Sequence, residues 1–196
     1  MNMECFSLFL LAIFYFSLLF KQFLMKRKGI EANILVNSAG KNNKIIITEI
    51  MVSIGTYGMA AIQFISSIFY DCLKHLNLPL YIKILGIFLE IVGIFFLIKA
   101  MIDMSDSWRQ GISLKQKTKL VTNGIYKISR NPAFFGFDLF YFGNFLQVPT
   151  YIQLIFTIFS ICAFHFQIIC EEESLITIFR DEYKNYKDKT PRYLLI

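Results

Sequence analysis

Long apolar runs separated by short polar segments dominate the chain. Four runs cover about residues 5–24, 45–70, 80–102 and 134–170. Each of the first three is close to the roughly 20 residues with which an α-helix crosses a membrane. The fourth run is longer, and Asn144, Gln147 and Pro149 interrupt it, so it predicts two helices joined by a tight turn. The pattern therefore predicts an all-α, polytopic membrane protein with about five transmembrane helices.

The polar segments predict how the chain is organised. A polar segment over 103–133 follows the third run, and a charged tail over 171–196 keeps helical spacing up to about Lys189. The length of 196 residues suggests one domain. Within it we expect residues 1–104 to form three N-terminal transmembrane helices. Residues 105–196 should form a core with a helical hairpin and a C-terminal helix.

The composition supports a membrane protein. Apolar residues make up 56% of the chain, with 22 Phe and 10 Tyr, and only 17% of the residues are charged. Soluble domains usually carry about 25% charged residues. The four cysteines form no CxxC pair and the two histidines are isolated, so we expect neither a disulfide framework nor a metal site. The net charge of +6 arises in the loops, and we expect no nucleic-acid partner.

The distribution of basic residues predicts the orientation in the membrane. The segments 21–44, 99–133 and 171–196 hold 18 of the 20 Lys and Arg residues, whereas the opposite side holds Lys74 and Lys83. Cytoplasmic loops carry an excess of Lys and Arg. We therefore expect these three segments, and with them the C-terminus and the site, on the cytosolic side, with the N-terminus outside.

A first polar cluster, over residues 119–136, leads into the fourth apolar run. Tyr126 and Arg130 are four residues apart, which places them on one face of a short helix. Asn131 suits the N-cap, and Pro132 suits the first position, of the helix that follows. The segment is either a binding site or only the start of a transmembrane helix.

A second cluster consists of three consecutive acidic residues, Glu171, Glu172 and Glu173, at the end of the last apolar run. At a membrane boundary they could bind a cation or accept hydrogen bonds from the ammonium group or hydroxyls of a ligand. The alternative is a solvated acidic helix end.

Three single residues are weaker candidates. Glu90 lies in the middle of the third run, where an acid is costly and should face the protein interior. It could line an acceptor cavity or pair with a polar neighbour. Asp138 lies one turn into the fourth helix and could face a pocket. Trp108 is either an interfacial anchor or a pocket wall.

The two clusters have the spacing of a known family. The motifs are Leu120-Val121-Thr122-x-Gly124-x-Tyr126, Arg130-x-Pro132-x-Phe134-x-Gly136, Glu171-Glu172-x-x-Leu175-x-x-x-Phe179-x-x-Glu182-Tyr183-x-x-Tyr186 and Thr190-Pro191-Arg192. They resemble the isoprenylcysteine carboxyl methyltransferases and the related phospholipid methyltransferases over about residues 105–192. Five spans agree with the small prokaryotic members of this family, so we expect a multi-pass protein of a prokaryotic plasma membrane.

The resemblance implies a cytosol-facing pocket for S-adenosylmethionine above the last two membrane helices. Tyr126 and Phe134 offer aromatic faces to the adenine ring or the sulfonium cation. Glu171 can hydrogen-bond the hydroxyls or the ammonium group of this cofactor. By position, the family's cofactor contacts fall on Thr118, Lys119, Leu120, Val121, Tyr126, Asn131, Pro132, Ala133, Phe134, Glu171 and Glu172.

Two positions depart from the family pattern. The family usually has His where this chain has Asn131, and Asn can position a ligand but cannot titrate near neutral pH. The prenylcysteine enzymes carry an Arg, implicated in binding the substrate carboxylate, where this chain has Gln167. Arg130 is a candidate to replace that charge. The candidate catalytic residues are therefore Asn131, Arg130 and Gln167.

The resemblance implies an S-adenosylmethionine-dependent methyltransferase that acts on a lipid-like or prenylated acceptor, similar to the carboxyl O-methyltransferases. Three alternatives stay open: a phospholipid N-methyltransferase, an NADPH-dependent membrane reductase and an inactive membrane scaffold. We expect the lipid bilayer and an amphipathic or prenylated acceptor as partners. The sequence does not predict the oligomeric state.

Overall fold

A computed structural model describes residues 3–37, 40–112 and 119–194. Within these ranges the chain forms helices and no strand, which confirms the all-α fold class. The long helices are α1 (Met3–Arg27), α2 (Asn43–Ser53), α3 (Met59–Ile68), α4 (Leu80–Met104), α5 (Pro132–Gln147), α6 (Tyr151–Phe179) and α7 (Asp181–Lys189). Short helical turns are η1 (Ile54–Gly58), η2 (Tyr70–Cys72), η3 (Ser105–Ser107) and η4 (Gly124–Lys127).

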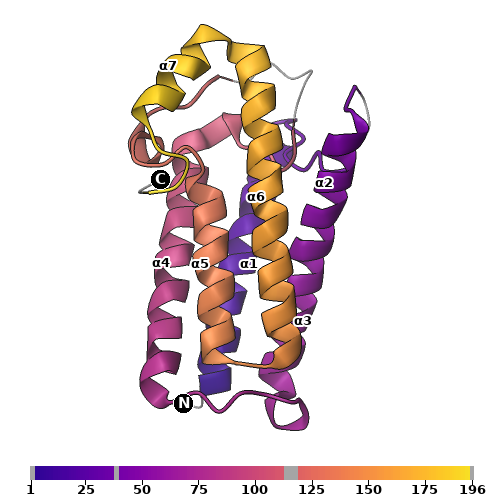
Figure 1. Cartoon of the computed structure of the whole chain (residues 1–196), viewed down its shortest axis with the longest axis vertical. Coiled ribbons are helices and arrows are strands. Elements are labelled where there is room, and N and C mark those ends of the chain that lie inside the picture. Colours follow the sequence, from indigo (N-terminus) through magenta and orange to yellow (C-terminus); the bar gives the residue numbers. More distant parts are fainter. Residues whose placement is uncertain (1–2, 38–39, 113–118, 195–196) are drawn as a thin grey trace.

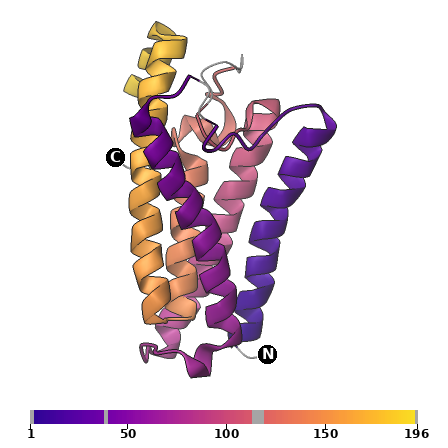
Figure 2. The ribbon, with the colours of Figure 1, turned by 90° about the vertical axis from the view of Figure 1, so that its right-hand side faces the viewer.

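The helices α1 to α6 run side by side along one long axis (Figure 1). The α3–α4 connection and the α5–α6 turn lie at one end of this bundle, and α7 lies at the other, together with the polar segments (Figures 1 and 2). Ion pairs join the basic segments at that second end, which we call the polar end. Lys28 Nζ lies 2.7 Å from Asp106 Oδ1, and Lys44 Nζ lies 2.7 Å from Glu173 Oε2.

Four helices in the described residues are long and apolar enough to cross a membrane: Cys5–Arg27, Asn43–Ile68, Leu80–Ser107 and Tyr151–Phe179. The second of them joins α2, η1 and α3 into one continuous helix. Large apolar side chains face outward from these helices, among them Phe16, Tyr81 and Ile155 at 67%, 70% and 64% exposure. Such surfaces suit lipid rather than water.

The fifth expected span corresponds to α5, which is shorter than the other four. It has 16 residues, or about 24 Å at the rise of an α-helix. Pro132 sets its start, and the α5–α6 turn with Pro149 follows its end. The helix lies between α4 and α6, in front of α1 in the view of Figure 1.

Glycine residues bring α4 and α5 into near contact of their backbones. A Cβ atom on Gly93 of α4 would lie 2.6 Å from the carbonyl oxygen of Gly136 on α5. A Cβ atom on Gly86 would lie 2.5 Å from the carbonyl oxygen of Gly143. Small residues allow such approach between helices in a membrane. This packing fixes where α5 begins, and therefore where Asn131 lies.

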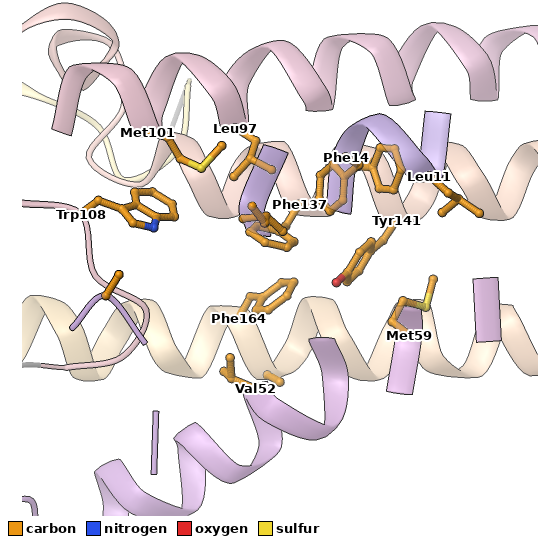
Figure 3. Packing of buried hydrophobic residues seen from close by; sticks show 14 of the residues in the cluster. Leu11, Phe14, Val52, Met59, Leu97, Met101, Trp108, Phe137, Tyr141 and Phe164 are labelled. Atoms are coloured by element: carbon orange, nitrogen blue, oxygen red, sulfur yellow. The ribbon is translucent and has the colours of Figure 1, made fainter. Parts of the chain in front are cut away.

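An aromatic core joins helices from the whole length of the chain (Figure 3). The ring of Phe14 on α1 stacks on Phe140 of α5, with ring centroids 3.8 Å apart and an angle of 4° between the planes. Phe164 of α6 packs against Phe137 and Tyr141. Because this core contains residues from both sides of position 104, the expected parts 1–104 and 105–196 pack as one body. Their separate roles stay a proposal.

A sharp reversal at Arg180 separates α6 from α7. Arg180 has φ of +49°, a left-handed conformation that is costly for a residue with a Cβ atom. The reversal folds α7 back, and the segment after it reaches the start of α5. The backbone N–H of Arg130 donates to the carbonyl of Pro191 at 2.9 Å. The C-terminal motif is thereby joined to the first polar cluster.

Candidate active site

A cavity of about 390 Å³ lies inside the polar end of the bundle. Its volume is within the range of about 300–1,000 Å³ that small-molecule sites occupy. Its wall comes from α1, from the continuous helix α2–η1–α3, from the segments around residues 104–111 and 126–137, and from α6. Residues that line it include Tyr15, Leu18, Leu19, Gln22, Leu35, Val52, Thr56, Tyr57, Ala60, Phe64, Met104, Trp108, Arg109, Gln110, Gly111, Phe137 and Phe164.

The cavity has a polar part and an apolar part. Arg109, Gln110 and Glu171 contribute to the polar part. Leu19 and Tyr57 line the cavity and are also 63% and 58% exposed on the outer surface of the bundle. The cavity therefore opens sideways between α1 and α2–η1, two helices that diverge toward the polar end (Figure 2). This side of the molecule faces the lipid if the bundle spans a membrane.

Tyr126 is held in the cavity wall by contacts from two directions. The preceding Gly124 has φ of +62°, and a Cβ atom there would collide with the carboxylate of Asp103. That carboxylate accepts a hydrogen bond of 2.8 Å from the backbone N–H of Ile125. From α7, the hydroxyl of Tyr186 donates to the carbonyl of Tyr126 at 2.6 Å. Burial raises the pKa of Tyr126 far above its usual value, so its phenol stays neutral.

The carboxylate of Glu172 binds the side chains of Arg130, Asn131 and Arg192, all at least 20 residues away from it in the sequence. Arg130 Nη2 lies 2.9 Å from Glu172 Oε1, and Arg192 Nη2 lies 2.9 Å from Glu172 Oε2. Asn131 Nδ2 donates to Glu172 Oε1 at 3.3 Å. The hydrogen bond to Glu172 raises the pKa of Arg192, which keeps it charged. Glu172 therefore holds the start of α5 against α6 and the C-terminal segment.

Arg130 is bound on all sides of its guanidinium group. Besides Glu172, Nη1 donates to the carbonyl of Lys187 at 3.0 Å and to that of Thr190. Its side chain is 7% exposed. The side chain of Asn131 likewise donates to Glu172 and to the carbonyl of Arg192. Helix α5 has Asn131 at its N-cap and Pro132 at its first position, as predicted, but the side chain of Asn131 makes no capping hydrogen bond.

Gln167 and Glu171 lie one turn apart on α6, and both line the cavity. Gln167 Nε2 donates to Glu171 Oε1 at 3.0 Å. Within the described part of the chain, Gln167 Oε1 and the indole Nε1 of Trp108 are buried and have no hydrogen-bond partner. Trp108 also lines the cavity. The wall therefore offers one free acceptor, one free donor and a carboxylate, which a buried polar ligand would satisfy.

The cavity brings together most of the residues singled out in the sequence. Eight of the expected catalytic and cofactor-binding residues line it: Tyr126, Arg130, Asn131, Pro132, Ala133, Phe134, Gln167 and Glu171. Lys119, Leu120, Val121 and Glu172 are not among the described residues that line it. Val121 packs instead against the cluster of Ala100, Ile125 and Tyr126. Thr118 lies outside the described residues.

The three weaker candidates, Glu90, Trp108 and Asp138, differ in whether they line the cavity. Trp108 is a pocket wall rather than a surface anchor, and it is 5% exposed. Glu90 and Asp138 do not line the cavity. Glu90 Oε1 accepts a hydrogen bond of 2.8 Å from Asn144, which also donates to Ser7 at 2.9 Å. Of the two roles considered for Glu90, the structure supports pairing with a polar neighbour.

The sequence interpretation missed the wall contributed by α1 and α2–η1–α3. Polar residues inside these apolar runs carry the available signal, since Gln22 and Thr56 both line the cavity. Gln22 Nε2 donates to the side-chain oxygen of Gln110 at 2.9 Å. The π-helical turn η1 carries Thr56 and Tyr57 into the wall, and such turns are frequent at functional sites.

Comparison with known proteins identifies the family. Residues 81–182 match the model of the phospholipid methyltransferase family. The chain belongs to the phospholipid methyltransferase family. It is also 30% identical over 95 residues to the protein-S-isoprenylcysteine O-methyltransferase of Schizosaccharomyces pombe. That alignment covers 47% of this chain and 40% of the relative, so the chain matches less than half of that protein's length.

The phospholipid methyltransferase match runs from the start of α4 into α7 and confirms the resemblance drawn from the motifs. It includes Tyr126, Arg130, Gln167 and Glu171, which line the cavity. The apolar wall from α1 and α2–η1–α3 lies outside the matched residues. Together with the long apolar helices, membership of this family indicates an integral membrane protein.

Proposed function

We propose that this protein transfers a methyl group from S-adenosylmethionine to the polar head of an amphipathic acceptor that enters from the lipid. The observation that carries the proposal is the single cavity lined by both sequence motifs. Tyr126 and Phe134 of the first motif, and Glu171 of the second, share its wall. The membrane methyltransferase family supports the reaction class.

The residues of the polar part suit this donor. S-adenosylmethionine supplies an electrophilic methyl group on a sulfonium ion, together with an adenine ring, ribose hydroxyls and an amino-acid tail. Tyr126, Phe134 and Trp108 offer aromatic faces for the ring or the cation. Glu171 and the free Oε1 of Gln167 can accept hydrogen bonds from hydroxyls or an ammonium group. The free indole N–H of Trp108 can donate to a carboxylate or a ring nitrogen.

The apolar part suits the acceptor. A lipid tail that passes between Leu19 and Tyr57 would stay in the bilayer while its head reaches the polar part. Val52, Ala60 and Phe64 also contribute to the apolar wall. The contribution of the protein to the reaction is then to align the acceptor with the methyl group and to exclude water.

Glu172, Arg130 and Asn131 act in this proposal as positioning residues. The carboxylate of Glu172 is bound by Arg130 and Arg192, and it does not reach the cavity wall. By fixing Arg130 and Asn131 it holds the start of α5, and with it Phe134, at the polar end. The absence of a titrating group at Asn131 suits a transfer that needs little proton movement.

We also propose that the polar end faces the cytosol. The three basic segments meet at this end, as the pairs Lys28–Asp106 and Lys44–Glu173 indicate. The positive-inside rule then assigns the active site and the C-terminus to the cytosolic side and the start of α1 to the opposite side.

A second candidate acceptor is an amine, as in a phospholipid head group. The guanidinium group of Arg130 is taken up by Glu172 and two carbonyls, and Gln167 is neutral. Arg109 also lines the cavity, and its Nη1 donates to the carbonyl oxygens of Asp106 and Trp108 at 2.9 and 2.7 Å. Glu171 and Gln167 would instead suit the hydrogen-bond donors of an amine.

The direct test is a methyl-transfer assay. The purified protein, reconstituted with a total lipid extract, is supplied with S-adenosylmethionine labelled in the methyl group. The proposal expects label in the lipid fraction, and mass spectrometry then shows whether oxygen or nitrogen is methylated. Binding of NADPH without binding of S-adenosylmethionine would favour a reductase, and binding of neither would favour a scaffold.

A further inference from the structure

An open groove of about 600 Å³ lies on the outer surface of the polar end, where the C-terminal segment folds back against α6. Its lining residues come from the start of α5, from α6, and from the end of α7 with the residues after it: Arg130, His165, Lys187, Asp188, Lys189, Thr190, Pro191, Arg192 and Tyr193. This groove is separate from the cavity of the candidate active site, and Arg130 is the one described residue that lines both.

The groove carries an excess of positive charge. Arg130 and Arg192 share the single carboxylate of Glu172, which leaves one positive charge over. Lys187 and Lys189 are exposed, and only Asp188 lies beside them in the groove. The described residues therefore leave two positive charges without a compensating carboxylate, in a concave surface that is open to solvent.

The groove also lies at the edge of the membrane-spanning part. His165 is 14 residues after the start of α6, which is about 21 Å along the helix axis. A hydrocarbon layer that begins at Tyr151 and is about 30 Å thick ends about 9 Å beyond His165, so the groove extends from inside this boundary outward to α7. Tyr193 hydrogen-bonds His165 at 3.3 Å between Oη and Nδ1. Next to this pair, Phe166 is 52% exposed, as expected for a side chain in lipid.

We propose that this groove binds the phosphate-bearing head group of an anionic phospholipid of the surrounding membrane. Lys187, Lys189 and Arg192 supply the positive charge, and Tyr193 with His165 forms the amphipathic floor that suits a membrane interface. The acyl chains would lie along the exposed apolar face of α6 near Phe166. Basic pockets of this kind beside transmembrane helices bind anionic lipid head groups.

Occupation of the groove should also influence the candidate active site, a consequence that rests on the proposed function. A head group that binds Arg192 contacts the same cluster that holds Glu172, Arg130 and Asn131. Arg130 and Asn131 line the cavity. Anionic lipid should therefore tighten the binding of S-adenosylmethionine, whereas lipid binding itself does not depend on the reaction.

The test is a titration of the detergent-solubilised full chain with phosphatidylglycerol or phosphatidylcholine, followed by native mass spectrometry. The wild type should bind phosphatidylglycerol more tightly than phosphatidylcholine. The double variant Lys187→Gln/Lys189→Gln should bind it more than tenfold more weakly, since each basic residue near an anionic surface contributes about fivefold. The matched control Lys127→Gln/Lys184→Gln removes the same charge from exposed residues outside the groove and should behave like the wild type.

A third variant guards against a folding defect. Asp188→Asn removes the one acid among the described residues that line the groove, and should strengthen phosphatidylglycerol binding. The proposal would be overturned if the two lysine double variants lost phosphatidylglycerol binding equally. Equal binding of phosphatidylglycerol and phosphatidylcholine by the wild type would also overturn it. Displacement of the lipid by the same concentration of inorganic phosphate would overturn it in favour of a free-anion site. If phosphatidylglycerol binds as expected but S-adenosylmethionine does not, the proposed function fails and the lipid site stands.

Discussion

Gln167 Nε2 donates a hydrogen bond of 3.0 Å to Glu171 Oε1, one helical turn further along α6. Both side chains line the cavity, and Gln167 is 1% exposed. Because Gln167 has no charge, it orients the carboxylate of Glu171 without neutralising it. The polar part of the cavity therefore keeps an oriented carboxylate that is available to a ligand.

The first prediction concerns this pair. Gln167→Leu leaves the buried Oε1 of Glu171 without its hydrogen-bond donor, which costs about 1–3 kcal/mol. We expect the affinity for S-adenosylmethionine to fall about tenfold or more, as measured by calorimetry. Glu171→Gln should also lower the affinity for S-adenosylmethionine. Because the two residues act together, the double variant Gln167→Leu/Glu171→Gln should lose less than the sum of the single losses. Strict additivity would show that the two side chains act independently.

The second prediction concerns Glu172, which stabilises the polar end. Glu172→Ala leaves the buried guanidinium of Arg130 without its carboxylate, and removal of one partner of a buried pair costs about 3 kcal/mol. We expect a clear fall in the melting temperature of the protein in detergent.

The neighbouring Glu173 supplies the control for Glu172. It pairs with Lys44 on the surface, where both side chains are more than half exposed. Glu173→Ala should leave the melting temperature nearly unchanged, because exposed ion pairs contribute little. Equal effects of the two variants would contradict the role given to Glu172.

The third prediction concerns the packing of α4 on α5. A Cβ atom on Gly136 would lie 2.8 Å from the carbonyl oxygen of Gly93, and backbone cannot yield as a side chain can. Gly136→Ala should therefore destabilise the protein by about 1–3 kcal/mol. At Gly58 the nearest atom is the end of the Phe156 side chain, so Gly58→Ala should cost less. A melting temperature that is lower for Gly58→Ala than for Gly136→Ala would contradict this packing.

The fourth prediction concerns pH. Burial raises the pKa of Tyr126 well above the usual value of about 10. A raised pKa means that the neutral phenol is favoured in the folded protein, so Tyr126 does not ionise between neutral pH and about pH 10. Tyr126→Phe should therefore leave the pH profile of methyl transfer unchanged in that window. Tyr126→Ala removes the ring and should weaken S-adenosylmethionine binding. A pH profile altered by Tyr126→Phe would show that the hydroxyl takes part in the reaction.

The helices could be predicted from the sequence because run length and polarity determine them almost alone. The long helices cover the predicted runs, and α7 ends at Lys189 as expected. The reversal at Arg180 could not be predicted, because nothing local favours a left-handed Arg. The π-helical turn η1 is likewise hidden in an apolar run, since it depends on how α2 and α3 pack against α6.

The site could be predicted only in part. Tyr126 and Phe134 are assigned to the site by the resemblance of their motifs to the methyltransferase family, and both line the cavity. Asn131 is the N-cap residue of α5, as predicted, but the donation of its Nδ2 to Glu172, 41 residues later in the chain, could not be predicted from local spacing. The apolar wall with Leu19 and Tyr57 depends on helix packing over long sequence distances, which a hydropathy pattern does not contain.

The central claim is that the cavity binds S-adenosylmethionine through Glu171. The measurement is a calorimetric titration of the detergent-solubilised wild type and of two matched variants, Glu171→Gln inside the cavity and Glu173→Gln outside it. We predict that the wild type and Glu173→Gln bind alike, and that Glu171→Gln binds about tenfold or more weakly. Absence of binding to the wild type at millimolar concentration, or equal affinity of all three proteins, would contradict the account.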